Sequence, residues 1–291
     1  AYITDITEPK DRAKSLGLIG AAFGLGFIIG PVMGGFLSLA GLNVPAFAAA
    51  ALSIFNLIAI IIWVPESLAP EDRQQMRTNP HTAFNLSNLL DEFRRPCVGP
   101  LLLITLFYGF SFTLFQSNFS LYAKEVLKLD VQNTGLVLTY VGLLSVIVQG
   151  FAIGKLTKKF KERKLITASI ISLAITLFIW GFTKQLWLLL IILAPIALSA
   201  GILNTLITSQ ITKAVYKEDV GGTLGLTSSI QTMAQITTPG MGGLILSTLG
   251  PWALGVTSSL FMVFAFITAI GKRVRHSDLD DKSPCYQQAI N

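Results

Sequence analysis

The 291-residue sequence has little charge, two cysteines and two histidines. Charged side chains make up 13% of the residues, about half the share found in soluble domains, which excludes a globule surrounded by water. Cys97 and Cys285 are isolated, and no cysteine–histidine cluster includes them, His81 or His276. The sequence therefore predicts neither a disulfide framework nor a metal site.

Motifs of enzymes and nucleotide-driven pumps are lacking as well. No GxxxxGK[ST] run is present to bind a phosphate chain, and neither histidine belongs to a recognisable motif of catalytic acids or nucleophiles. The net charge is +6, but the basic residues are not interleaved with aromatic residues as in a nucleic-acid-binding surface. We therefore expect no catalytic residues, no cofactor and no nucleic-acid partner.

Apolar sequence, by contrast, is abundant. All charges are confined to short stretches, and six windows between them contain none. A helix needs about 20 apolar residues to span a bilayer. Four windows match one span each and two match two spans each, so the sequence predicts an all-α membrane protein with eight transmembrane helices. The windows are 15–65, 96–123, 131–154, 165–183, 185–212 and 220–271.

The two long windows and the basic residues predict the topology. Turn-forming residues at 41–45 and 249–251 divide the long windows into two helices each. Of the 22 Lys and Arg residues, 19 fall on one side of the predicted membrane, and only Lys124, Lys128 and Lys184 fall on the other. The excess of positive charge on cytoplasmic loops predicts that both ends of the chain are cytoplasmic.

Residues 219–245 repeat residues 11–37. A shift of 208 residues without a gap makes nine of 27 positions identical, where about two are expected by chance. Pro31, Gly34 and Gly35 correspond in this way to Pro239, Gly242 and Gly243. The last two helices therefore duplicate the first two in the same direction, as in carriers built from parallel repeats.

The repeat also predicts the domain organisation. Residues 1–65 would be the last two helices of an N-terminal bundle, 66–95 a cytoplasmic linker with a short amphipathic helix, 96–271 a six-helix C-terminal bundle, and 272–291 a disordered tail. Since the second bundle has six helices, the first should have six too, which places four more helices (about 110 residues) before Ala1. We therefore expect an N-terminally truncated fragment of a twelve-helix protein.

Two motifs resemble those of the major facilitator superfamily. Residues 1–7 and 11–13, followed by the glycine-rich run at 26–35, resemble helix five of its drug/proton antiporters of the tetracycline-efflux type. Residues 154–164 resemble the loop Gly-x-Leu-Ala-Asp-Arg-x-Gly-Arg-Arg in its second-half copy, with Lys158 in place of the aspartate. The resemblance implies a major facilitator fold, whose helices 5–12 in a twelve-helix, two-bundle carrier match the eight predicted here.

Both motifs suggest segments that move during a conformational change. Small residues let helices approach closely and proline bends a helix, so we expect a kinked packing seam that opens and closes between the bundles; ordinary helix packing is the alternative. The glycine motif consists of Gly26, Gly30, Pro31, Gly34 and Gly35, with its copy at Pro239, Gly242 and Gly243. The loop motif (Gly154, Lys155, Arg163 and Lys164) is either a cytoplasmic latch or only a topology signal.

Polar and aromatic side chains within the predicted spans are candidates for contact with substrate. Amides in hydrocarbon usually face the protein interior or a watery cavity, although they can also join helices without touching a substrate. The candidates are Gln116, Gln149, Asn204, Gln231, Gln235 and Phe115.

The resemblance implies a secondary transporter, with proton-coupled efflux of drugs or metabolites by alternating access. No Asp, Glu, His, Lys or Arg lies inside the windows, so residues for proton coupling are expected in the missing helices. The alternatives are a metabolite symporter or uniporter of the same fold, and a membrane protein that binds or scaffolds without transport. We expect a monomer in the plasma or inner membrane, with a small-molecule substrate, protons and the lipid bilayer as partners.

Overall fold

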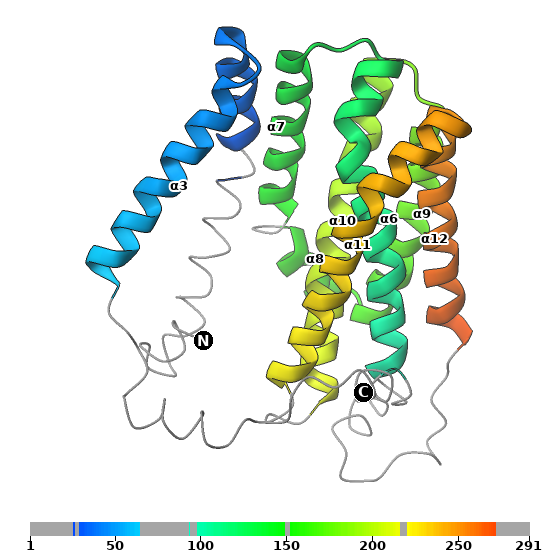
Figure 1. Ribbon diagram of the computed structural model, residues 1–291. Helices are drawn as coiled ribbons and strands as arrows, with labels where there is room; N and C mark the ends of the chain where they lie inside the picture. Colours follow the sequence, from blue (N-terminus) through cyan, green and yellow to red (C-terminus); the bar gives the residue numbers. More distant parts are fainter. Residues whose placement is uncertain are drawn as a thin grey trace. The chain divides into compact units, whose positions relative to one another are not determined.

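The computed structural model describes residues 26, 29–64, 93, 98–148, 152–215 and 220–271, and every regular element in these ranges is a helix (Figure 1). The packing of the chain divides it into two units. The first comprises Ala1–Asn85 and Asp130–Leu143, and the second comprises Leu86–Leu129 and Leu144–Asn291.

The first unit contains the helix Ile29–Ala40, helix α3 (Val44–Trp63) and most of α7 (Val131–Ile147). Helix Ile29–Ala40 ends in the 3-10 turn η1 (Ser38–Ala40), and the residue after it, Gly41, has a φ of 137°. Glycine adopts this backbone conformation without the steric cost of a side chain. The predicted turn at 41–45 is therefore present, and α3 begins directly after it.

Helix α3 is apolar on all sides. Its mean hydropathy reaches 2.3, and none of its side chains is buried. Twenty residues of helix extend for about 30 Å, which is the thickness of the hydrocarbon core of a bilayer. An evenly apolar and exposed helix of this length is suited to contact with lipid.

The second unit is a helical bundle around α6 (Val98–Val126). Helix α6 packs against α11 (Val220–Thr248) and α12 (Pro251–Gly271), while α9 (Glu162–Gly181) packs against α10 (Leu186–Ala214) and α12. Figure 1 shows these helices side by side, with α11 crossing α6 at an angle. The apolar faces of the bundle helices thereby cover one another.

An aromatic cluster fills part of the core of this bundle. The rings of Phe115 and Tyr122 from α6 lie 4.8 and 4.6 Å from the ring of Trp180 in α9, measured between centroids. The hydroxyl of Tyr122 donates to the carbonyl oxygens of Trp180 at 2.8 Å and Thr183 at 2.7 Å. The two carbonyls lie at and just after the end of α9, where Trp180 O also accepts from Thr183 N at 3.0 Å, so the Tyr122 hydroxyl connects α6 to that end.

Glycines allow α9 and α12 to approach each other closely. A Cβ atom built on Gly255 would lie 2.6 Å from the carbonyl oxygen of Leu177, and one on Gly181 would lie 2.6 Å from that of Trp252. Both distances are too short for a real side chain. The contact between these two helices therefore depends on the absence of a side chain at both positions.

Five of the described helices have the length and hydropathy of membrane spans: α3, α6, α9, α10 and α12. Two shorter apolar helices, Ile29–Ala40 and Val131–Ile147, correspond to two further predicted spans. Helix α11 has 29 residues but does not meet the same hydropathy criterion, because serine, threonine, glutamine and glycine interrupt its apolar sequence. The all-helical membrane fold is confirmed, whereas the count of eight spans stays a prediction.

The window 131–154, in which one span is expected, contains one described helix and the start of a second. Helix α7 ends at Ile147, and a separate helix, α8 (Ile153–Lys159), follows the undescribed residues 149–151. The basic segment 155–164 is consequently not all loop, because its first five residues belong to α8. The amphipathic helix predicted within 66–95 and the disordered tail predicted at 272–291 fall outside the described residues.

Both predicted copies of the repeat share a helix–turn–helix order. Helix Ile29–Ala40 is followed by a turn at Gly41 and by α3, and α11 is followed by a turn at Gly250, with a φ of 95°, and by α12. A proline, Pro45 or Pro251, lies in the first turn of the second helix of each pair. The local architecture of the duplicated segments therefore agrees with their sequence similarity.

Candidate functional site

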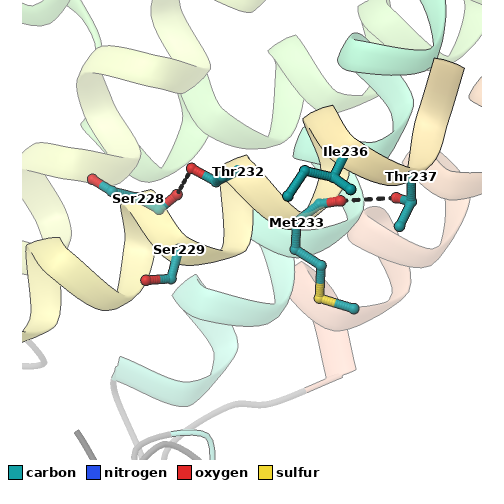
Figure 2. A pocket seen from close by; sticks show the side chains of 6 residues that line it. All are labelled: Ser228, Ser229, Thr232, Met233, Ile236 and Thr237. Carbon is teal, nitrogen blue, oxygen red and sulfur yellow. Dashed lines mark hydrogen bonds between the residues drawn. The ribbon is translucent and has the colours of Figure 1, made fainter.

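A groove of about 410 Å³ lies along α11 in the second unit (Figure 2). Three of its hydroxyl groups donate to the backbone of their own helix: Ser229 Oγ to Gly225 O at 3.0 Å, Thr232 Oγ1 to Ser228 O at 2.9 Å, and Thr237 Oγ1 to Met233 O at 2.8 Å. The hydroxyl oxygens can still accept hydrogen bonds from a ligand. The lining residues are Ser228, Ser229, Thr232, Met233, Ile236 and Thr237.

The groove combines polar and apolar groups in a way that suits a small amphipathic molecule. Its hydroxyl groups offer acceptors, while Met233 and Ile236 offer an apolar surface and are 56% and 74% exposed. Methionine is flexible and polarisable, so it adapts to ligands of different shape. The groove is shallow and open, and all its lining residues belong to α11, so a ligand there would need further contacts from other parts of the protein.

Two predicted residues of α11, Gln231 and Gln235, stand beside this groove in the helical register. Gln235 is exposed and follows Thr232 by three residues and Ser228 by seven, while Gln231 is half-buried. Pro239 has no N–H, so the carbonyl of Gln235 loses its usual partner one turn further along the helix. The carbonyl of Gln235 is thus an additional backbone acceptor on the helix that carries the groove.

The other predicted substrate residues are not gathered at the groove. Gln116 in α6 and Asn204 in α10 are exposed but do not line it. Phe115 is only 5% exposed and packs edge-on against Trp180 in the core. Gln149 lies outside the described residues.

Sequence reasoning missed the hydroxyl residues that line most of the groove. Ser228, Ser229, Thr232 and Thr237 are common in membrane helices, so each by itself carries little information. The available signal was the spacing of Ser228, Ser229 and Thr232, because Thr232 follows the two serines by four and three residues and so lies on the same side of a helix. The same residues explain the lower hydropathy of α11.

The buried side chain of Asn118 joins α6 to α11. It is 4% exposed, and its Nδ2 donates to the carbonyl oxygen of Leu114 at 3.0 Å and to that of Thr238 at 3.5 Å. The amide lies against Gly242, where a Cβ atom would overlap it. The proline–glycine motif of α11 therefore provides both an acceptor and the space for a buried amide.

The glycine motif of the first unit makes one close contact with α7. A Cβ atom on Gly135 of α7 would lie 2.8 Å from the carbonyl oxygen of Pro31, and one on Gly35 would lie 3.6 Å from Cα of Gln132. Among the described residues, nothing lies within 4 Å of a Cβ built on Gly26, Gly30 or Gly34. Pro31 and Gly35 thus form the close-packed part of the motif.

The basic loop motif is exposed to solvent. Gly154, Lys155, Arg163 and Lys164 are all exposed, and Glu162 is the one acid among residues 155–164. The carboxylate of Glu162 accepts from Lys213 Nζ at 2.7 Å, and its other oxygen accepts a short hydrogen bond from Gln210. Glu162 therefore joins the start of α9 to the end of α10.

Within the described residues, no three His, Cys, Asp or Glu side chains gather into a group that could hold a metal ion. The described parts of the spans carry ionisable side chains other than tyrosine only near helix ends, such as Lys124, Glu162 and Lys213. The groove on α11 is consequently lined by neutral groups alone.

Comparison with known proteins identifies the family. The Major Facilitator Superfamily matches residues 1–152 and, in a second overlapping match, residues 101–282. Solute carrier family 22 member 18 of Rattus norvegicus is 29% identical over 254 residues, covering 87% of this chain and 62% of that protein. Tetracycline resistance protein, class C, of Escherichia coli is 29% identical over 243 residues, covering 82% of this chain and 59% of that protein.

A solved structure shows the same fold. The human organic anion transporter MFSD10 (TETRAN) superimposes with a TM-score of 0.62 at 20% sequence identity, over 92% of this chain and 66% of that one. The chain spans about three fifths of the length of the curated relatives that it matches. With its helical bundle, its repeated helix pair and sequence matches across both halves, the chain belongs to the Major Facilitator Superfamily.

Proposed function

We propose that this chain is the part of a secondary transporter that corresponds to helices 5–12, and that the whole protein exports small apolar or cationic molecules in exchange for protons. Members of the superfamily are transporters rather than enzymes, and the relatives include proteins named for multidrug and tetracycline resistance. The observation that carries the proposal is a neutral groove of mixed polarity on an otherwise apolar bundle.

The groove on α11 would form one wall of the substrate path. Its hydroxyl groups would bind polar atoms of the substrate, while Met233 and Ile236 would contact apolar parts. Gln231 and Gln235 would extend this wall, and Gln116, Gln149 and Asn204 would serve other stages of transport. Because the wall carries no charge, selectivity would depend on shape and polarity rather than on ion pairing.

Alternating access would use the two close-packed motifs. In the proposed organisation, residues 1–65 belong to one bundle, 66–95 to a linker and 96–271 to the other bundle, with both chain ends in the cytoplasm. The contact of Pro31 and Gly35 with Gly135 would form a seam that opens when the bundles rock. The buried amide of Asn118 would keep α11 attached to its own bundle during that motion.

Proton coupling would require groups that this chain lacks inside its spans. None of the six charge-free windows contains Asp, Glu, His, Lys or Arg. Since the chain covers about three fifths of its relatives, we place the proton-binding residues in the remaining part of the whole protein. The transporter would act as a monomer in a plasma or inner membrane.

A flux measurement on the full-length protein tests the proposal. The protein would be reconstituted into liposomes, and ethidium, an apolar cation, would be followed with and without an imposed proton gradient. We expect the gradient to drive ethidium against its concentration. Ethidium flux that does not change with the proton gradient would indicate a uniporter. Ethidium flux driven in the same direction as the protons would indicate a symporter, and the absence of counterflow for every ligand tested would indicate a scaffold.

Substitutions in the groove test its role separately. We expect Thr232→Val and Ser228→Ala each to reduce transport about fivefold, as expected for the loss of one hydrogen bond. Ser53→Ala in helix α3 serves as the control. It likewise removes an exposed hydroxyl that donates to the backbone of its own helix, at 2.9 Å to Ala49 O. Equal effects at Ser228 and Ser53 would contradict the assignment of the groove.

A further inference from the structure

The segment 155–164 carries six cations and one acid, the densest positive charge in any ten residues of the chain. In the helical register of α8, Lys155, Lys158 and Lys159 are three and four residues apart and share one exposed face. Ile153 is buried on the other side of the same helix. Helix α8 therefore presents a face of three cations next to the start of a membrane span.

The acid within the segment does not neutralise these cations, because its carboxylate is bound elsewhere. Glu162 pairs with Lys213 of α10 at 2.7 Å and accepts a further hydrogen bond from Gln210. Both partners come from the end of α10 and lie outside the basic segment. Among the described residues, this acid thus leaves the charges of Lys155, Lys158 and Lys159 available to an external anion.

The first turn of α9 adds to the positive potential. Arg163 and Lys164 are exposed and lie directly after the first residue of the helix. A helix N-terminus already bears a partial positive charge, so it repels the two cations. An anion, by contrast, would be attracted both by the helix N-terminus and by the cations. A negatively charged ligand would relieve this unfavourable arrangement.

Phe160 indicates what kind of anion would bind. This side chain separates α8 from α9, is 45% exposed, and has Lys159 Nζ 5.7 Å from the centre of its ring. The apolar sequence of α9 begins at Leu165, only a few residues later, so Phe160 would lie near the surface of a membrane spanned by α9. Aromatic residues at this level insert among lipid headgroups.

We propose that the segment 155–164 binds the phosphate headgroup of anionic phospholipids, with Lys155, Lys158, Lys159, Arg163 and Lys164 holding the phosphate and Phe160 inserting beside it. Clusters of four to eight basic residues directly next to a membrane helix attract anionic lipids in this way. The site is distinct from the groove on α11 and does not depend on which solute is carried. Its consequence is that the C-terminal bundle is anchored in an anionic leaflet at the junction of α8 and α9.

Native mass spectrometry of the purified full-length protein tests the proposal, with phosphatidylglycerol as the anionic probe and phosphatidylcholine as the zwitterionic one. We expect the triple variant K155Q/K158Q/K159Q to raise the apparent dissociation constant of phosphatidylglycerol about 100-fold and to leave phosphatidylcholine unchanged. The control K124Q/K128Q/K184Q removes three charges at positions predicted to lie on the opposite side of the membrane. It should change the constant by less than about threefold.

Equal effects of the two triple variants, or equal retention of the two lipids by the unaltered protein, would overturn the proposal. Should the first variant fail to fold, the unaltered protein still decides the question, because the retention of phosphatidylglycerol must fall steeply as salt is added. Phe160→Ser should weaken retention without any change of charge. Displacement of the lipid by equimolar inorganic phosphate would show a simple anion site and refute a lipid site.

Discussion

The side-chain amide of Asn118 in α6 lies directly against Gly242 in α11, with no space between them for a methyl group. The amide is buried and donates to backbone carbonyls of both helices, at 3.0 Å to Leu114 and 3.5 Å to Thr238. A side chain at position 242 would therefore displace an amide that is held in place by hydrogen bonds. Gly242 and Asn118 together define how α11 rests on α6.

Gly242→Ala should destabilise the protein, because the added methyl group overlaps the Asn118 amide. We expect a loss of about 1–3 kcal/mol in the free energy of unfolding, as for other overpacked cores. Thermal unfolding of the purified protein in detergent measures it. Gly243→Ala is the matched control, since nothing in the described residues lies within 4 Å of its Cβ position. An equal loss at both positions would show that Asn118 does not restrict Gly242.

Gly255→Ala should cost more than Gly242→Ala. Its methyl group would lie 2.5 Å from Cα of Gly181 and 2.6 Å from the carbonyl oxygen of Leu177, which are backbone atoms of α9. Backbone cannot rotate away as a side chain can, so α9 and α12 would have to separate. We expect a loss above about 3 kcal/mol, measured by the same unfolding experiment. A smaller loss than that of Gly242→Ala contradicts this account.

Tyr122→Phe should weaken the attachment of α6 to the end of α9. The change removes the hydroxyl that donates to Trp180 O and Thr183 O, and leaves buried carbonyl groups without this donor. We expect a loss of about 1–3 kcal/mol. Tyr108→Phe is the comparison, because the Tyr108 hydroxyl makes a single longer bond of 3.2 Å to Ala200 O and should cost about 1 kcal/mol or less.

Gly135→Ala should impair transport by the full-length protein more than it impairs folding. Its methyl group would lie 2.8 Å from the carbonyl oxygen of Pro31, at the proposed seam. The added methyl group would hinder closure of the seam, so we expect ethidium flux to fall about tenfold. This corresponds to an increase of about 1.4 kcal/mol in the activation free energy of transport. Gly34→Ala, which meets nothing within 4 Å in the described residues, should transport normally. Normal flux in Gly135→Ala would remove the seam from the mechanism.

The amino-acid sequence alone determined the helical membrane fold and the position of its main breaks. Charge has a high cost in hydrocarbon, so the charge-free windows could only be helices, and glycine marks the turns at Gly41 and Gly250. The repeat of Pro31, Gly34 and Gly35 at 239–243 likewise required only the comparison of the chain with itself. These features depend on residues that are close together in the chain, so the amino-acid sequence is sufficient to predict them.

The tertiary structure alone decided which side chains meet. Phe115, a candidate for substrate contact from its sequence, lies in the core because Trp180 and Phe119 of the folded bundle surround it. The roles of Asn118 and of the hydroxyl residues of α11 became clear only from the side of the helix on which each lies in the folded bundle. Helical periodicity shows which residues share a face, but only the packing of neighbouring helices decides whether that face is covered, and such contacts join residues far apart in the chain.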